Sequence, residues 1–182
     1  MTNTKKLTAS AIMIALATVL MWVSKLIPAV WLQGGSVTLA SMVPIIIIGV
    51  KFGTKWGISS AFAYSLIQMM FGFYPPPTQT ALYFILVILL DYVFAYGVLG
   101  LSGVFYNMLS KNKSFALAFS GFAVTLLRYI CHIISGILIW GVYAGEGQSV
   151  LAYSLIYNGS YMIPEILITT IALWVMRKRI LK

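Results

Sequence analysis

Charged residues are scarce in this sequence. They make up 8% of its 182 residues, and only 3 of them are Asp or Glu. A soluble domain carries about 25% charged residues. Hydrophobic residues account for 61% of the chain and the mean hydropathy is +0.97. A soluble fold of this size cannot bury so much apolar surface, so the composition predicts an all-α integral membrane protein with one transmembrane domain over residues 1–182.

The residues that catalysis and metal binding require are also few. The chain has one histidine and one cysteine, Cys131, which excludes an internal disulfide. It contains no phosphate-binding loop of the Walker type, no H-E-x-x-H motif and no G-x-S-x-G elbow. With so few groups for acid–base chemistry, we expect a protein that is not an enzyme and has no metal and no cofactor. The basic residues flank apolar runs instead of forming a patch, which argues against nucleic acid.

Apolar runs separated by turn residues predict six transmembrane helices, since about 20 apolar residues cross a bilayer. The expected helices cover residues 7–28, 37–50, 54–73, 81–109, 115–143 and 151–177. The first is interpreted as a retained helix because no cleavage signal accompanies it. The proline-rich turn 74–78 stops the third, because proline cannot continue the helical hydrogen-bond ladder.

The basic residues gather on one side of this arrangement. With the N-terminus in the cytoplasm, ten of the 12 Lys and Arg residues fall on the cytoplasmic side. The other two are Lys25, near the outer end of the first helix, and Arg128, within the fifth. The positive-inside rule therefore predicts a multi-pass protein of the cell membrane with both termini cytoplasmic.

Asp91 is the residue that indicates a site most clearly. It lies within the apolar run 81–98, where a carboxylate is costly unless a partner compensates its charge. Such a position favours a cationic or hydrogen-bonding ligand, or a charge on a neighbouring helix. A purely structural role is the alternative.

One face of the expected helix 115–143 carries further polar groups. Arg128, His132, Gly136 and Trp140 recur every four residues and therefore share a face. Gly136 is predicted to leave a gap there that would admit a flat ring. The alternatives are that His132 satisfies a contact between helices and that Trp140 anchors the helix at the membrane interface.

The helices 81–109 and 151–177 add groups at a similar depth. Tyr92 follows Asp91, and Tyr153 and Asn158 lie near the outer end of the last helix. At about 1.5 Å rise per residue, the polar groups of the three helices fall within roughly 16 Å of the outer surface. A carboxylate, an imidazole, a carboxamide and aromatic faces suit a small, flat, cationic or nitrogen-rich ring compound. Helix packing is the alternative role for Asn158 and the tyrosines.

Arg128 and Glu165 are expected deeper in the membrane, at similar depths. Both lie about 21–23 Å from the outer surface by the same rise per residue. Opposite charges at one depth predict a structural ion pair between these two side chains in the inner half of the bilayer.

The chain resembles the substrate-binding S components of energy-coupling factor vitamin transporters, most closely the thiamine-specific S component. The resemblance covers nearly the whole chain, and the matching stretches are 33–44, 89–92, 127–136 and 153–158. It implies a six-helix bundle with the vitamin bound near the extracellular side. It assigns ligand-binding roles to Asp91, Tyr92, His132, Gly136, Trp140, Tyr153 and Asn158.

The resemblance also implies partners. Ala11 and Ala15 match the small-residue motif with which S components contact a shared transmembrane coupling protein. That protein and two ATPase subunits would supply the energy, so ATP would be used only by the partner subunits. Trp31 and Gln33 are candidates for a lid, although this chain has Gly35 where some members place a tryptophan over the ligand.

Two other functions fit the residues. The same module could take another ring compound, such as a hydroxymethylpyrimidine precursor or a B6 vitamer. A secondary transporter of small organic cations would instead use Asp91 as a proton-coupling group and work without partners.

Overall fold

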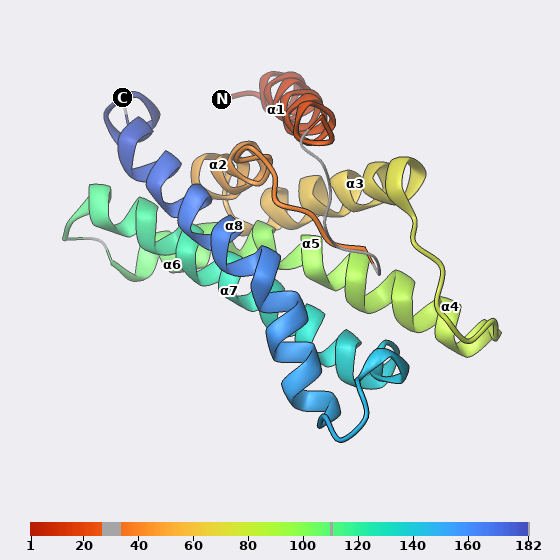
Figure 1. Ribbon diagram of the computed structural model, residues 1–182. Coiled ribbons are helices and arrows are strands. Elements are labelled where there is room, and N and C mark those ends of the chain that lie inside the picture. Colours follow the sequence, from red (N-terminus) through yellow and green to blue (C-terminus); the bar gives the residue numbers. More distant parts are fainter. Residues whose placement is uncertain (27–33, 110, 182) are drawn as a thin grey trace.

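The computed structural model describes residues 1–26, 34–109 and 111–181, and within these ranges the secondary structure is entirely helical (Figure 1). Six helical stretches follow one another, as the apolar runs predict. The first three are α1 (Asn3–Ser24), α2 (Val43–Phe52) and α3 (Thr54–Gly72). A continuous rod then covers Ala81–Met108, and α7 (Lys113–Leu138) and α8 (Val150–Ile180) complete the bundle.

The rod Ala81–Met108 changes its winding along its length. It starts as α4 (Ala81–Val87), widens into the π-helical segment η1 (Ile88–Phe94), and returns to α-helix in α5 (Ala95–Gly97). A tighter 3-10 segment, η2 (Val98–Leu101), leads into α6 (Ser102–Met108). The apolar run predicts one uniform helix over 81–109, so the π-helical segment, which contains Asp91, is a difference from that prediction.

Four of the helices are long and apolar enough to cross a membrane: α1, the rod, α7 and α8. The 10 residues of α2 extend only about 15 Å. Large apolar side chains cover the outer faces of the long helices, for example Ile156 at 67% and Val175 at 69% exposed. Such faces suit a lipid surrounding, where every backbone polar group must be satisfied within a helix.

The short helix α2 is the centre of the apolar core. Its residues from Val43 to Gly49 are all buried, and they pack with Tyr64, Leu99 and Leu173 from three other elements. The backbones of α3 and the rod meet closely beside it, because a Cβ atom on Gly57 would lie 2.6 Å from the carbonyl oxygen of Gly100.

The second expected helix begins later than predicted. Residues 37–42 are not helical, and α2 starts at Val43 with Pro44 in its first turn. Proline suits that place because the first helical N–H groups have no partner within the helix. The residues before α2 therefore form an irregular segment, 34–42, which is hydrogen-bonded to α1 and to α8.

Both chain ends lie at the upper left of Figure 1, whereas the connection between α3 and α4 lies at the right and the one between α7 and α8 at the bottom. This arrangement agrees with an even number of crossings. The side that faces the cytoplasm stays a prediction from the basic residues.

Candidate functional site

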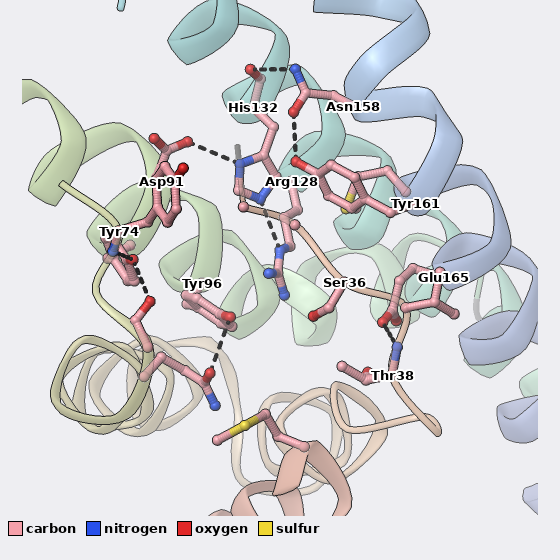
Figure 2. A pocket seen from close by; sticks show the side chains of 18 of the residues that line it. Ser36, Thr38, Tyr74, Asp91, Tyr96, Arg128, His132, Asn158, Tyr161 and Glu165 are labelled. Atoms are coloured by element: carbon pink, nitrogen blue, oxygen red, sulfur yellow. Dashed lines mark hydrogen bonds and ion pairs between the residues drawn. The ribbon is translucent and has the colours of Figure 1, made fainter. Parts of the chain in front are cut away.

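A cavity of about 590 Å³ lies inside the bundle, and it carries most of the polar side chains that the sequence singles out. Its walls come from α1, segment 34–42, α3, the rod, α7 and α8. Figure 2 shows Asp91, His132 and Arg128 on one side of it and Glu165 with Thr38 on another. Five of the seven predicted ligand-binding residues line this cavity: Asp91, Tyr92, His132, Trp140 and Asn158.

Asp91 is the centre of a hydrogen-bond network that joins the rod to α7. Its Oδ1 lies 3.0 Å from Nδ1 of His132. Its Oδ2 accepts from the hydroxyl of Ser135 at 2.7 Å and from the indole N–H of Trp140 at 3.1 Å. The Asp91 side chain remains 16% exposed and that of His132 10%. The carboxylate is therefore held in place and is still reachable from the cavity.

Arg128 determines the tautomer of His132. The Nε of Arg128 donates to Nε2 of His132 at 3.3 Å, and a guanidinium has no acceptor atom. The imidazole therefore accepts at Nε2 and donates its Nδ1–H to Asp91. In this form the ring is neutral, and it connects the cation of Arg128 to the carboxylate of Asp91.

The π-helical segment η1 turns several residues of the rod toward the cavity. Val87 and Tyr96 would lie about 180° apart around a straight α-helix, because each residue advances about 100°. Both of them line the cavity, together with Asp91. A π-helical turn absorbs one extra residue, which reduces the angle between Val87 and Tyr96 to about 80°. Widened turns of this kind are frequent at functional sites.

The predicted ion pair between Arg128 and Glu165 is wrong. No nitrogen–oxygen pair between these side chains lies within 4.0 Å. The guanidinium of Arg128 lies over the ring of Tyr96, 4.0 Å from its centroid. Glu165 instead accepts from the backbone N–H of Thr38. Equal depth was the basis of the prediction, and depth does not determine the direction in which a side chain leaves its helix.

The gap predicted at Gly136 does not exist. A Cβ atom there would overlap Oγ of Ser154 and would lie 2.9 Å from Nδ2 of Asn158. Gly136 is buried and lets α8 approach α7 closely, so it contributes to helix packing. Tyr153 does not line the cavity either, and its ring stacks on Tyr157 at 5.6 Å between centroids. Direct ligand contact by these two residues has no geometric support here.

Asn158 and Tyr92 line the cavity, but their polar groups are engaged within the protein. Nδ2 of Asn158 donates to the carbonyl oxygen of His132 at 3.1 Å, and its Oδ1 accepts from Tyr161 at 2.5 Å. The hydroxyl of Tyr92 donates to the carbonyl oxygen of Gly72 and accepts from the N–H of Tyr74, both at 2.9 Å. These two side chains position neighbouring walls of the cavity.

Several lining residues were absent from the predicted site. Tyr74 comes from the proline-rich turn and lies 5.5 Å from the ring of Trp140, centroid to centroid. Tyr157 and Tyr161 come from α8, and residues 34–38 with Ser41 come from segment 34–42. The sequence does contain a signal for α8, because Tyr157, Tyr161 and Glu165 recur every four residues. Residues 34–36, with Gly34 and Gly35, fall in the expected connection before the second helix, whereas for residues 37–42 the one local signal against a helix is Pro44.

Three further predictions concern a lid, a partner-contact surface and a metal site. Trp31 and Gln33, the candidates for a lid, lie outside the described residues. Ala11 and Ala15 are both exposed on α1, so no part of the described chain covers them. In the described ranges no group of three His, Cys, Asp or Glu side chains gathers as a metal site.

Long apolar helices around an internal cavity with polar side chains define a class of protein: a multi-pass membrane protein with a cavity of a size that admits a small molecule. The family follows from similarity. The model of the family described as "Thiamine transporter protein (Thia_YuaJ)" matches residues 7–182. The chain therefore belongs to this thiamine transporter family, and it is a transporter and not an enzyme.

Relatives and a solved structure agree with this assignment. The chain is 36% identical over 151 residues to the thiamine transporter ThiT of Bacillus subtilis, which covers 78% of this chain and 74% of the relative. It is 31% identical over 96 residues to ThiT of Lacticaseibacillus paracasei, covering 48% of each. The structure of ThiT from Listeria monocytogenes has the same fold, with a TM-score of 0.74 and 22% identity over 97% of this chain and 95% of that one.

Proposed function

We propose that this chain binds thiamine in the cavity around Asp91 and presents it for uptake as the substrate-binding subunit of an energy-coupling factor importer. The observation that carries the proposal is the Asp91 carboxylate, held by three donors inside an apolar bundle and still exposed to the cavity. Thiamine has a permanently charged thiazolium ring, so it supplies the cation that such a carboxylate favours.

The charges of the cavity favour a cationic ring beside Asp91. Lys25, Asp91, Arg128 and Glu165 all line the cavity, so their charges cancel when both carboxylates are ionised. Lys25 donates to the carbonyl oxygen of Phe71 and lies over the ring of Trp22. Asp91 is held by uncharged donors, so its charge is available to attract a cation.

Aromatic side chains give the cavity flat surfaces for rings. Trp140 and Tyr74 lie side by side at the Asp91 end, and the ring of Tyr161 lies 5.9 Å from that of His132, centroid to centroid. Rings of this kind attract a cationic heterocycle through their π faces.

Calorimetric titration of the purified protein in detergent tests the proposal. We expect saturable binding of thiamine and weaker binding of hydroxymethylpyrimidine and pyridoxine in competition. Absence of thiamine binding would contradict the assignment of the ligand, and tighter binding of one of the other compounds would replace it.

The partner subunits need a separate test. Reconstitution with the transmembrane coupling protein and the two ATPase subunits should give ATP-dependent thiamine uptake, and bulky replacements of Ala11 and Ala15 should abolish it without affecting thiamine binding. Uptake by the chain alone, driven by a proton gradient, would instead support a secondary transporter.

A further inference from the structure

Segment 34–42 is an irregular wall of the cavity in a place where irregular backbone is costly. Gly34, Gly35, Val37 and Thr38 all line the cavity. Gly34 and Gly35 have φ angles of 86° and 94°, a region that favours glycine. At membrane depth, the backbone N–H and C=O groups of a non-helical segment are tolerated where they find partners in the protein or line a water-filled cavity.

One face of α8 supplies contacts to this segment on three successive turns. The hydroxyl of Tyr157 donates to the carbonyl oxygen of Gly34 at 2.7 Å. The ring of Tyr161 packs on Gly35 so closely that a Cβ atom there would lie 2.6 Å from a ring carbon. Glu165 accepts from the backbone N–H of Thr38. Because these α8 residues are four apart, the segment runs along one stripe of the helix.

The other side of the segment is held by α1. The N–H of Leu39 donates to the hydroxyl of Ser24, the last residue of α1, at 2.8 Å. Two neighbouring backbone N–H groups, those of Thr38 and Leu39, are therefore bonded to two different helices. Loss of either bond would free that end of the wall from one helix.

Within the described ranges, Thr38 is the hydrogen-bonding partner of Glu165, and Arg128 adds an electrostatic attraction without direct contact. Glu165 is 2% exposed, its second carboxylate oxygen forms no hydrogen bond within the described ranges, and it makes no ion pair with Arg128. Burying a carboxylate is costly unless its partners compensate. The contact with Thr38 is thus the specific interaction that this side chain makes.

We infer that Glu165 is a positioning residue, which fixes segment 34–42 against α8 through the Thr38 N–H and thereby slows the escape of ligand from the cavity. The inference rests on the proposed function for its ligand. It differs from a simple electrostatic role, in which the charge of Glu165 would attract a cation and the hydrogen bond would be incidental.

Three substitutions separate these two roles. Glu165→Gln removes the charge but keeps an acceptor oxygen within hydrogen-bonding distance of the Thr38 N–H. Glu165→Asp keeps the charge, but its shorter side chain moves the acceptor oxygen away from that N–H. Glu165→Ala removes both. Thr169→Val, one turn further along the same face of α8, is the matched control for packing damage, because Thr169 is buried and does not line the cavity.

Thiamine association and dissociation rates give the first readout. A positioning role predicts that Glu165→Asp and Glu165→Ala raise the dissociation rate about tenfold or more with little change in association, as is usual for lost contacts at a binding site. Glu165→Gln and Thr169→Val should stay close to wild type. Dissociation that is fast in Glu165→Gln and normal in Glu165→Asp would overturn the inference in favour of the electrostatic role.

Hydrogen–deuterium exchange of the ligand-free protein gives the second readout and does not depend on thiamine. Amides of segment 34–42 should exchange faster in Glu165→Asp and Glu165→Ala but not in Glu165→Gln. Unchanged exchange in the first two variants would refute the inference. Faster exchange in a protein whose wild type does not bind thiamine would support the anchoring and would refute the proposed ligand instead.

Discussion

Replacing Asp91 by Asn is expected to weaken thiamine binding strongly, because the amide cannot satisfy the network around it. All three partners of the carboxylate act as donors: Nδ1 of His132, the hydroxyl of Ser135 and the indole N–H of Trp140. An Asn side chain offers one acceptor oxygen and one donor nitrogen. In either orientation, its NH₂ group faces a donor, so part of the network is lost together with the charge.

The size of the effect follows from the loss of a buried charge opposite a cationic ligand. Truncating one partner of such a pair costs about 2–5 kcal/mol. We take the lower part of this range, about 2–4 kcal/mol, because Asn preserves one hydrogen-bond acceptor. At about 1.4 kcal/mol per tenfold change, the Kd should rise by about 30-fold to 700-fold.

Calorimetry in detergent measures this change, and thermal unfolding without ligand shows whether the variant is folded. Glu146→Gln is the matched control, since it makes the same chemical change on an exposed residue in the connection between α7 and α8. A folded Asp91→Asn variant that binds thiamine within about threefold of wild type, a difference of well under 1.4 kcal/mol, would refute the electrostatic reasoning.

Three other outcomes are expected. Gly136→Ala should lower the unfolding temperature, because overpacking costs about 1–3 kcal/mol. Gly97→Ala is the control and should not lower it, since a Cβ atom there would meet nothing within 4 Å. Equal unfolding temperatures of the two variants would contradict the close packing of α7 and α8. Tyr92→Phe should weaken thiamine binding about fivefold, since loss of a hydrogen bond worth about 1 kcal/mol loosens the turn after α3. Calorimetry would show this loss, and unchanged affinity would contradict the positioning role. In a cysteine-free background, Lys111→Cys should react with a membrane-impermeant reagent only from the cytoplasmic side and Gly145→Cys only from outside; the reverse pattern would invert the predicted topology.

The helices were predictable because their signals are long and local. Apolar runs of membrane-spanning length fix where α1, the rod, α7 and α8 lie, and the turns between them contain proline, glycine or charge. The meeting of Asp91 and His132 was also predictable, since both are scarce polar groups at a similar depth. These arguments need only the position along each helix. Trp140 bonds to Asp91 as well, but it lies beyond the end of α7 at Leu138, so the predicted four-residue helix face does not account for its position.

What could not be predicted depends on rotation and on packing between segments. The π-helical segment Ile88–Phe94 consists of residues that suit an ordinary helix, so no local signal distinguishes it. Arg128 and Glu165 were assigned the same depth, but Arg128 turns onto Tyr96 and Glu165 turns onto Thr38. The role of Gly136 depends on which side chain of α8 lies opposite it. The sequence does not determine how α7 and α8 are aligned along each other.

A structure of the protein with bound thiamine would show where the ligand lies. We expect ligand density inside the cavity, with the charged ring within about 6 Å of the Asp91 carboxylate and the rings of Trp140, Tyr74 or Tyr161 against its faces. Thiamine bound outside this cavity, or bound within it with the charged ring away from Asp91, would refute the proposed binding mode.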